Sequence, residues 1–141
     1  MKLLTAEYDY TTEAAQVELE HKGKIYKGSA HYKPSEKDFP NRFFGQRLAE
    51  KRAMIGYWKE QRDKNRIKKQ ALESFKKDLQ ASIKNPFVPD CINEIFDKLN
   101  QHIKYYDKEM RNCKKEIEEQ KKDIQKDIQL REQLIKKVNN K

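Results

Sequence analysis

Residues 85–90 read NPFVPD, and this stretch decides the fold because it separates two long segments whose apolar residues recur at helical spacing. Two prolines within six residues end a helix, since proline lacks the backbone N–H and clashes with the preceding turn. Asp90 is a typical N-cap residue, so a second helix is expected from residue 91. A short turn between two long helices of similar length indicates an antiparallel helical hairpin.

The segment after the turn, residues 91–139, has the spacing of a coiled-coil helix. Steps of four and three residues meet eleven apolar positions out of fourteen, counting Tyr and Cys. The fourteen positions are Ile92, Phe96, Leu99, Ile103, Tyr106, Met110, Cys113, Ile117, Gln120, Ile124, Asp127, Arg131, Leu134 and Val138. Near Asp127 the apolar row moves to Ile128 and Ile135, which is typical of a stutter.

The segment before the turn, residues 41–84, is also expected to be helical, with Pro40 at its entry. Two apolar stripes end and begin within residues 58–69, WKEQRDKNRIKK, in which nothing between Trp58 and Ile67 is apolar. The first stripe is Phe44, Leu48, Ile55 and Trp58, and the second is Ile67, Ala71, Phe75 and Leu79.

The polar stretch 58–69 raises a pairing problem. In an antiparallel hairpin, Arg62 falls opposite Asn112 and Cys113, where the row of the second helix is apolar at Met110, Cys113 and Ile117. Either the first helix breaks near residues 59–66 and folds back, or a second chain or partner protein covers the apolar stretch. Neither Gly nor Pro lies there to force a break, which favours a continuous helix and a partner.

Residues 1–40 are expected to form a small antiparallel sheet. A two-residue turn at Lys22-Gly23 sets His21 opposite Lys24, Leu19 opposite Tyr26 and Val17 opposite Gly28. This register gathers apolar residues on one face, which is the reason to trust it. That face holds Val17, Leu19, Tyr26, Ala30 and Tyr32. Residues 3–10 are expected to add a third strand.

The apolar face of a small sheet needs a cover, because an isolated hairpin is only marginally stable in water. The side chains at the entry to the first helix are the expected cover: Phe39, Phe43, Phe44 and Leu48. The fold class is therefore α+β, with a sheet over residues 1–40 packed on a helical hairpin over residues 41–141.

Composition excludes several classes of protein. The sustained apolar period argues against disorder, although 39% of the residues are charged. No apolar run approaches the ~20 residues that span a bilayer, and no signal-peptide pattern opens the chain. Cys91 and Cys113 lie 22 residues apart on one predicted helix, beyond disulfide reach. Reduced thiols predict a cytoplasmic protein.

Enzymatic signals are weak. The segment GKIYKG lacks the spacing of a phosphate-binding loop, and the three histidines and two cysteines show no metal-ligand spacing. Cys113 falls on the heptad row, where a small core residue is expected. We therefore expect no enzymatic activity, cofactor or metal.

The net charge of +9 is concentrated in residues 41–84, which carry thirteen Lys and Arg against five Asp and Glu. Such a helix suits an acidic protein surface or a phosphate backbone, with nearby aromatic rings as anchors, while plain solvation of a long helix is the third explanation. The predicted contact residues are Arg47, Arg52, Tyr57, Trp58, Lys59, Arg62, Arg66 and Lys69.

Residues 23–55, GKIYKGSAHYKPSEKDFPNRFFGQRLAEKRAMI, resemble small accessory proteins of phages and mobile elements of Gram-positive bacteria. The resemblance is carried by Gly23, Gly28, Pro34, Asp38-Phe39, Phe44-Gly45, Leu48-Ala49 and Arg52-Ala53. It covers about a quarter of the chain, and it implies a binder that inhibits or redirects a host protein.

Three functions are consistent with these features. The first is a non-enzymatic binder that occupies a surface of a host protein or nucleoprotein, for example as an inhibitor of a bacterial defence system. The second is direct nucleic-acid binding through the basic helix 41–84. The third is a scaffold or assembly factor that forms a homo-oligomer through the helical hairpin.

Overall fold

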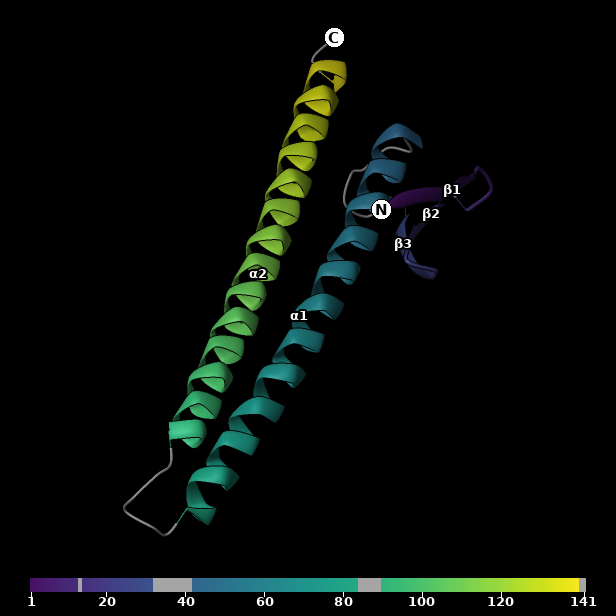
Figure 1. Ribbon diagram of the computed structural model, residues 1–141. Helices are drawn as coiled ribbons and strands as arrows, with labels where there is room; N and C mark the ends of the chain where they lie inside the picture. The colour runs from purple at the N-terminus through teal and green to yellow at the C-terminus, as the bar shows by residue number, and fades with distance from the viewer. Residues whose placement is uncertain (13, 32–41, 84–89, 140–141) are drawn as a thin grey trace. The chain divides into compact units, whose positions relative to one another are not determined.

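The computed structural model describes residues 1–12, 14–31, 42–83 and 90–139 (Figure 1). Three strands precede two long helices, which confirms the predicted α+β class. The strands are β1 (Lys2–Asp9), β2 (Ala14–His21) and β3 (Lys24–His31), and the helices are α1 (Arg42–Ser82) and α2 (Asp90–Asn139). The predicted turn NPFVPD and the predicted positions of Tyr32 and Phe39 lie outside the described residues, except for Asp90, the first residue of α2.

The chain divides into two compact units. Residues 1–58 and 116–141 form the first, the sheet unit, and residues 59–115 form the second, the two-helix unit. This division differs from the predicted boundary at residue 40, because the first part of α1 packs on the sheet.

The sheet has the order β1-β2-β3 with both pairs antiparallel. His21 pairs with Lys24, Leu19 with Tyr26 and Val17 with Gly28, which confirms the predicted register. The turn places Lys22 at φ 51° and Gly23 at φ 78°, the positive values that a tight hairpin of this type requires. The predicted third strand is β1, whose pairing with β2 shifts between Leu3 and Thr5.

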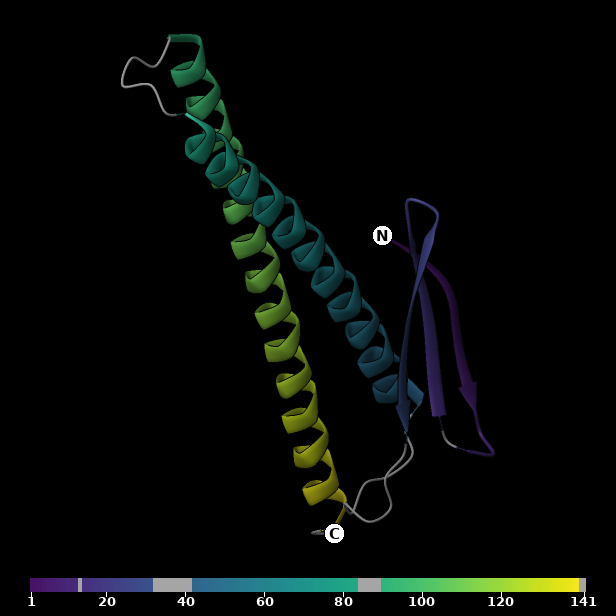
Figure 2. The same ribbon diagram turned by 90° about the horizontal axis from the view of Figure 1, so that it is seen from below.

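The sheet and α1 meet through very small residues. Ala15, Val17, Leu19 and Ala30 form the core together with Ala49 and Ala53 of α1. A Cβ atom added at Gly28 would lie 1.8 Å from the carbonyl oxygen of Ala49, so glycine is what permits this approach. Figures 1 and 2 show the beginning of α1 running beside the strands.

The predicted aromatic cover is only partly correct. Phe44 is buried and Leu48 packs against the core, but Phe43 is 62% exposed. Ala49 and Ala53, four residues apart on one face of α1, contact the sheet where larger side chains were expected. A bulky residue there would push the helix away from Gly28.

The C-terminal part of α2 keeps its heptad row further than predicted. Ile117 and Gln120 are buried, and Ile124, Asp127 and Arg131 are half-buried at the next positions of the row. Ile128, where the row was expected to move, is 37% exposed. The predicted shift to Ile128 was therefore wrong, whereas Ile135 is half-buried as expected.

In the two-helix unit, α1 runs without interruption through residues 59–66, as favoured from the sequence. Cys113 of α2 is 3% exposed, so the apolar stretch that was expected to need a partner is already covered. Asn65 and Arg62 of α1 lie close to the Cys113 thiol. The pairing predicted for Arg62 is confirmed, and the inferred gap was wrong, because the half-buried Arg62 and Asn65 lie beside Cys113.

Three of the four residues of the second predicted stripe of α1 do not pack inward, and only Leu79 is half-buried. Ile67 is 62% and Phe75 is 54% exposed, and Ala71 between them is also exposed. The half-buried positions of this part of α1 include Asn65, Lys69 and Leu72 instead. Steps of four and three residues connect them, which is the spacing of a helix–helix contact.

Candidate binding surface

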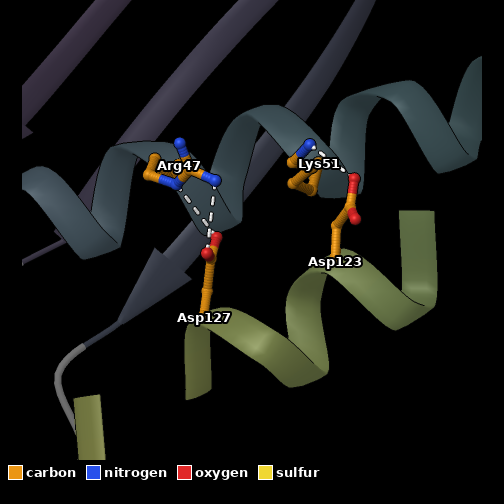
Figure 3. A network of polar contacts seen from close by, with 4 residues as sticks. All are labelled: Arg47, Lys51, Asp123 and Asp127. Carbon is orange, nitrogen blue, oxygen red and sulfur yellow. Dashed lines mark hydrogen bonds and ion pairs between the residues drawn. The ribbon is translucent and has the colours of Figure 1, made fainter. Parts of the chain in front are cut away.

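Arg47, one of the predicted contact residues, is used inside the sheet unit. Its Nε and Nη2 atoms donate hydrogen bonds of 3.0 and 3.2 Å to the carboxylate of Asp127 on α2 (Figure 3). One turn further along α1, Lys51 donates a 3.1 Å hydrogen bond to Asp123. The bond to Asp127 holds the pKa of Arg47 above its usual value. These two ion pairs, one turn apart, join α1 to α2. A partner that binds Arg47 would have to break its pair with Asp127.

Arg52 is also used internally. Its Nη1 atom donates a 2.8 Å hydrogen bond to the backbone carbonyl oxygen of Ser29 on β3. Because β3 is an edge strand, this contact occupies a carbonyl group that a foreign strand would otherwise use. Arg52 therefore protects the sheet edge.

The predicted aromatic anchors, Tyr57 and Trp58, pack inside the sheet unit. The ring of Tyr57 lies edge-on to the rings of His21, Tyr26 and Trp58, with centroid distances of 4.9, 5.2 and 4.9 Å. Both residues are half-buried. Stacking on an exposed base would require these rings to leave their present contacts.

Lys69 is paired within the two-helix unit. Its Nζ atom donates a 2.9 Å hydrogen bond to Asp107 on α2 and lies 3.8 Å from Glu73. Arg111 donates a second hydrogen bond to Asp107. The pKa of Asp107 is lowered by Lys69 first and Arg111 second, and the pKa of Lys69 is raised by Asp107. Asp107 is thus an ion-pair centre at the contact between the helices.

The remaining predicted cations lie on one flank of α1, where Lys59 and Arg66 are exposed and Arg62 is half-buried beside Cys113 of α2. Lys59, Arg62 and Arg66 follow one another at spacings of three and four residues, so they share one face of the helix. We call these three residues the basic flank. Arg66 is 50% exposed, and Arg62 and Arg66 contact only their helix neighbour Asp63, at 3.4 and 3.5 Å, among the ion pairs of the described residues. Such exposed local pairs are weak.

The structure also reveals a surface that the sequence did not indicate. Ile67, Ala71 and Phe75 lie at four-residue spacing on the outside of α1, and we call them the outer row. In the sequence they looked like core because apolar residues usually pack inward. The inner face of this part of α1 is instead formed by Asn65, Lys69 and Leu72. Their spacing of four and three residues identifies a helix contact only once the position of α2 is known.

Other chemistry is sparse in the described part of the chain. Residues 1–12, 14–31, 42–83 and 90–139 contain no group of three His, Cys, Asp or Glu side chains placed to hold a metal ion. Burial raises the pKa of the Cys113 thiol, which disfavours the nucleophilic thiolate. Neither described helix has a stretch long and apolar enough to cross a bilayer.

Comparison of the sequence with known protein families finds one family that matches part of the chain. A family described as "Protein of unknown function (DUF725)" matches residues 88–141, a segment that contains all of α2. The match includes Asp107, Asp123 and Asp127 but neither the sheet nor α1, and it brings no activity with it. No curated protein and no solved structure matches the chain.

Proposed function

We propose that this protein is a non-enzymatic binder that occupies an acidic surface of another protein through the basic flank Lys59, Arg62 and Arg66. The observation that supports it most is how the cations of α1 are distributed. Arg47, Lys51 and Lys69 are paired with carboxylates of α2, whereas the cations of the basic flank are not. A partner can reach Lys59 and Arg66, the two exposed members of the flank, without breaking a contact between the helices.

An acidic protein surface accounts for the flank better than nucleic acid does. Asp63 lies between Arg62 and Arg66 and contacts both, so the flank has mixed charge, which suits a patterned protein surface more than a uniform row of phosphates. Tyr57 and Trp58, the aromatic residues that precede the flank in the sequence, are held in ring contacts of the sheet unit. Nucleic acid remains the alternative that the experiment below separates.

The resemblance of residues 23–55 to phage accessory proteins indicates a bacterial host protein as the first partner to test, and a defence complex as the specific version. The two cysteines are free, Cys91 exposed and Cys113 buried, which supports a reducing compartment and hence the cytoplasm.

Affinity capture from a nuclease-treated bacterial lysate tests this function. Lys59→Glu with Arg66→Glu reverses two exposed charges and spares Arg62, which lies beside Cys113. Lys121→Glu with Lys122→Glu on α2 is the matched control, since both lysines are exposed and the charge change is equal. We expect the wild type and the control to retain one dominant protein, and the Lys59/Arg66 variant to lose it.

Three results would contradict the proposal. Capture that is unchanged in the Lys59/Arg66 variant excludes the basic flank, and equal loss in both variants shows a general charge effect. Capture that occurs from an untreated lysate but not from the nuclease-treated one, together with a gel shift that weakens as salt rises, supports nucleic-acid binding instead.

A further inference from the structure

The outer row of α1 is an apolar surface directed away from α2. With about 100° of rotation per residue, Ala71 lies roughly 130° around the helix axis from the row that contains Asn65, Lys69 and Leu72. Ile67 and Phe75 are the most exposed large apolar side chains of α1 in the two-helix unit. A partner that covers them therefore does not need to displace α2.

The residues of this surface are arranged symmetrically about Ala71. Four residues before and after it lie Ile67 and Phe75, both apolar, and seven residues before and after it lie Lys64 and Asp78, which have opposite charges. Residues seven apart occupy nearly the same face of a helix, so all five point to the same side. Lys64 and Asp78 are exposed.

We infer that a second copy of this chain covers the outer row, with the two α1 helices antiparallel across a twofold axis at Ala71. In that arrangement Ile67 meets Phe75 of the partner subunit, and Lys64 meets Asp78 of the partner subunit. Each contact occurs twice, as an isologous interface requires. Ala71, on the axis, is small enough for two helices to approach closely.

Charge complementarity favours a second copy over an unrelated protein. The antiparallel register pairs one cation with one anion at both ends and places no like charges opposite each other. Among the described residues Asp78 has no ion-pair partner, and Lys64 is paired only with Glu60 one turn earlier, at 3.4 Å, with a side chain 54% exposed. Both side chains are therefore available across the interface.

The dimer leaves the basic flank accessible. Arg66 lies roughly 140° around α1 from Ala71, so the second copy covers one side of the helix and the basic flank occupies another. The inference does not depend on the proposed function. If both hold, the dimer presents two basic flanks related by the twofold axis, which raises affinity for a partner with repeated acidic sites.

Sedimentation equilibrium of the purified full chain tests the dimer. The interface is a single helix pair at the small end of specific interfaces, so we expect the average mass to rise above the 17.0 kDa of one chain between about 10 and about 300 µM. Ile67→Glu should keep the protein at the mass of one chain throughout, with unchanged circular dichroism because the side chain is mostly exposed.

Charge reversal tests the register. Lys64→Glu should weaken association about tenfold, because two ion pairs become two repulsions, and adding Asp78→Lys should restore it. Lys108→Glu, an exposed change on α2, is the control and should have no effect. A wild type that stays at 17.0 kDa at about 300 µM, an Ile67→Glu variant that still dimerises, or a double variant that is not restored would each overturn the inference.

These outcomes are independent of the result of the capture experiment, which tests partner binding by the basic flank. A monomeric wild type that still captures its partner refutes the dimer alone. A wild type that dimerises, but whose capture of a protein does not depend on Lys59 and Arg66, refutes the proposed function alone.

Discussion

Gly28→Ala is the substitution whose effect the structure predicts most directly. The new Cβ atom would lie 1.8 Å from the carbonyl oxygen of Ala49 and 2.7 Å from the backbone nitrogen of Ala53. Both neighbours are backbone atoms of α1, so no side-chain rotation relieves the clash. Ordinary contact begins at 3.4 Å, and the helix and the strand must therefore separate by roughly 1.6 Å.

The size of the effect follows from three contributions. Overpacking of this kind costs about 1–3 kcal/mol. The separation also loosens the contacts of Ala49 and Ala53, which are fully buried against the sheet. Alanine recovers about 0.5–1 kcal/mol relative to glycine through the lower entropy of the unfolded chain. We expect a net loss of about 2 kcal/mol in the free energy of unfolding.

Gly56→Ala is the matched control, because the same change on α1 meets no atom within 4 Å. In an exposed helix position alanine should add about 0.5–1 kcal/mol. Urea unfolding followed by the fluorescence of Trp58, the single tryptophan, reports on the sheet unit where both substitutions lie. A Gly28→Ala variant as stable as the wild type would refute the close packing of β3 on α1.

Three further predictions concern charge and burial. A double-mutant cycle of Arg47→Ala and Asp127→Ala should give a coupling of about 0.5–1 kcal/mol that shrinks in 1 M salt, since the pair is partly exposed; a zero coupling at low salt would contradict it. The pKa of Asp107 is lowered in the folded state, so its stabilising contribution is present above the unfolded pKa and is lost as pH falls through the folded pKa. Thermal melts below about pH 4 should therefore lose stability more steeply in the wild type than in Asp107→Asn, and parallel pH profiles would show that the contact is not formed. Phe44→Ala should cost about 3 kcal/mol in urea unfolding, because Phe44 is buried, whereas Phe43→Ala should change stability by less than about 1 kcal/mol; equal effects would contradict the orientation of the two rings.

The hairpin register was predictable because two independent signals agreed. The Lys22-Gly23 turn fixes which residues are opposite, and the alternation of Val17 and Leu19 with charged residues fixes the buried face. The extent of α2 was predictable because the spacing of its apolar residues persists for many turns. The continuity of α1 through residues 59–66 was predictable because neither Gly nor Pro lies there.

The faces of α1 were not predictable in the same way. Apolar periodicity shows which residues avoid water, but it does not show which neighbour a helix face meets. Ala49 and Ala53 carry little hydrophobic signal, yet they define the contact with the sheet, because Gly28 leaves room only for a small side chain. Conversely, Ile67 and Phe75 carry a strong signal and lie outside.

The charge of α1 shows why pairing must be established before a surface is inferred. The excess of cations over residues 41–84 suggested one continuous basic surface, but Arg47, Lys51 and Lys69 each meet an aspartate of α2. In all three pairs the cation is on α1 and the anion is on α2, so the charge of α1 partly serves to hold α2. Each pair contributes little to the free energy of unfolding. If α1 and α2 packed in a different register, however, the same cations would no longer lie opposite aspartates. A surface can therefore be inferred only from the cations that this pairing leaves exposed, which on α1 include Lys59 and Arg66.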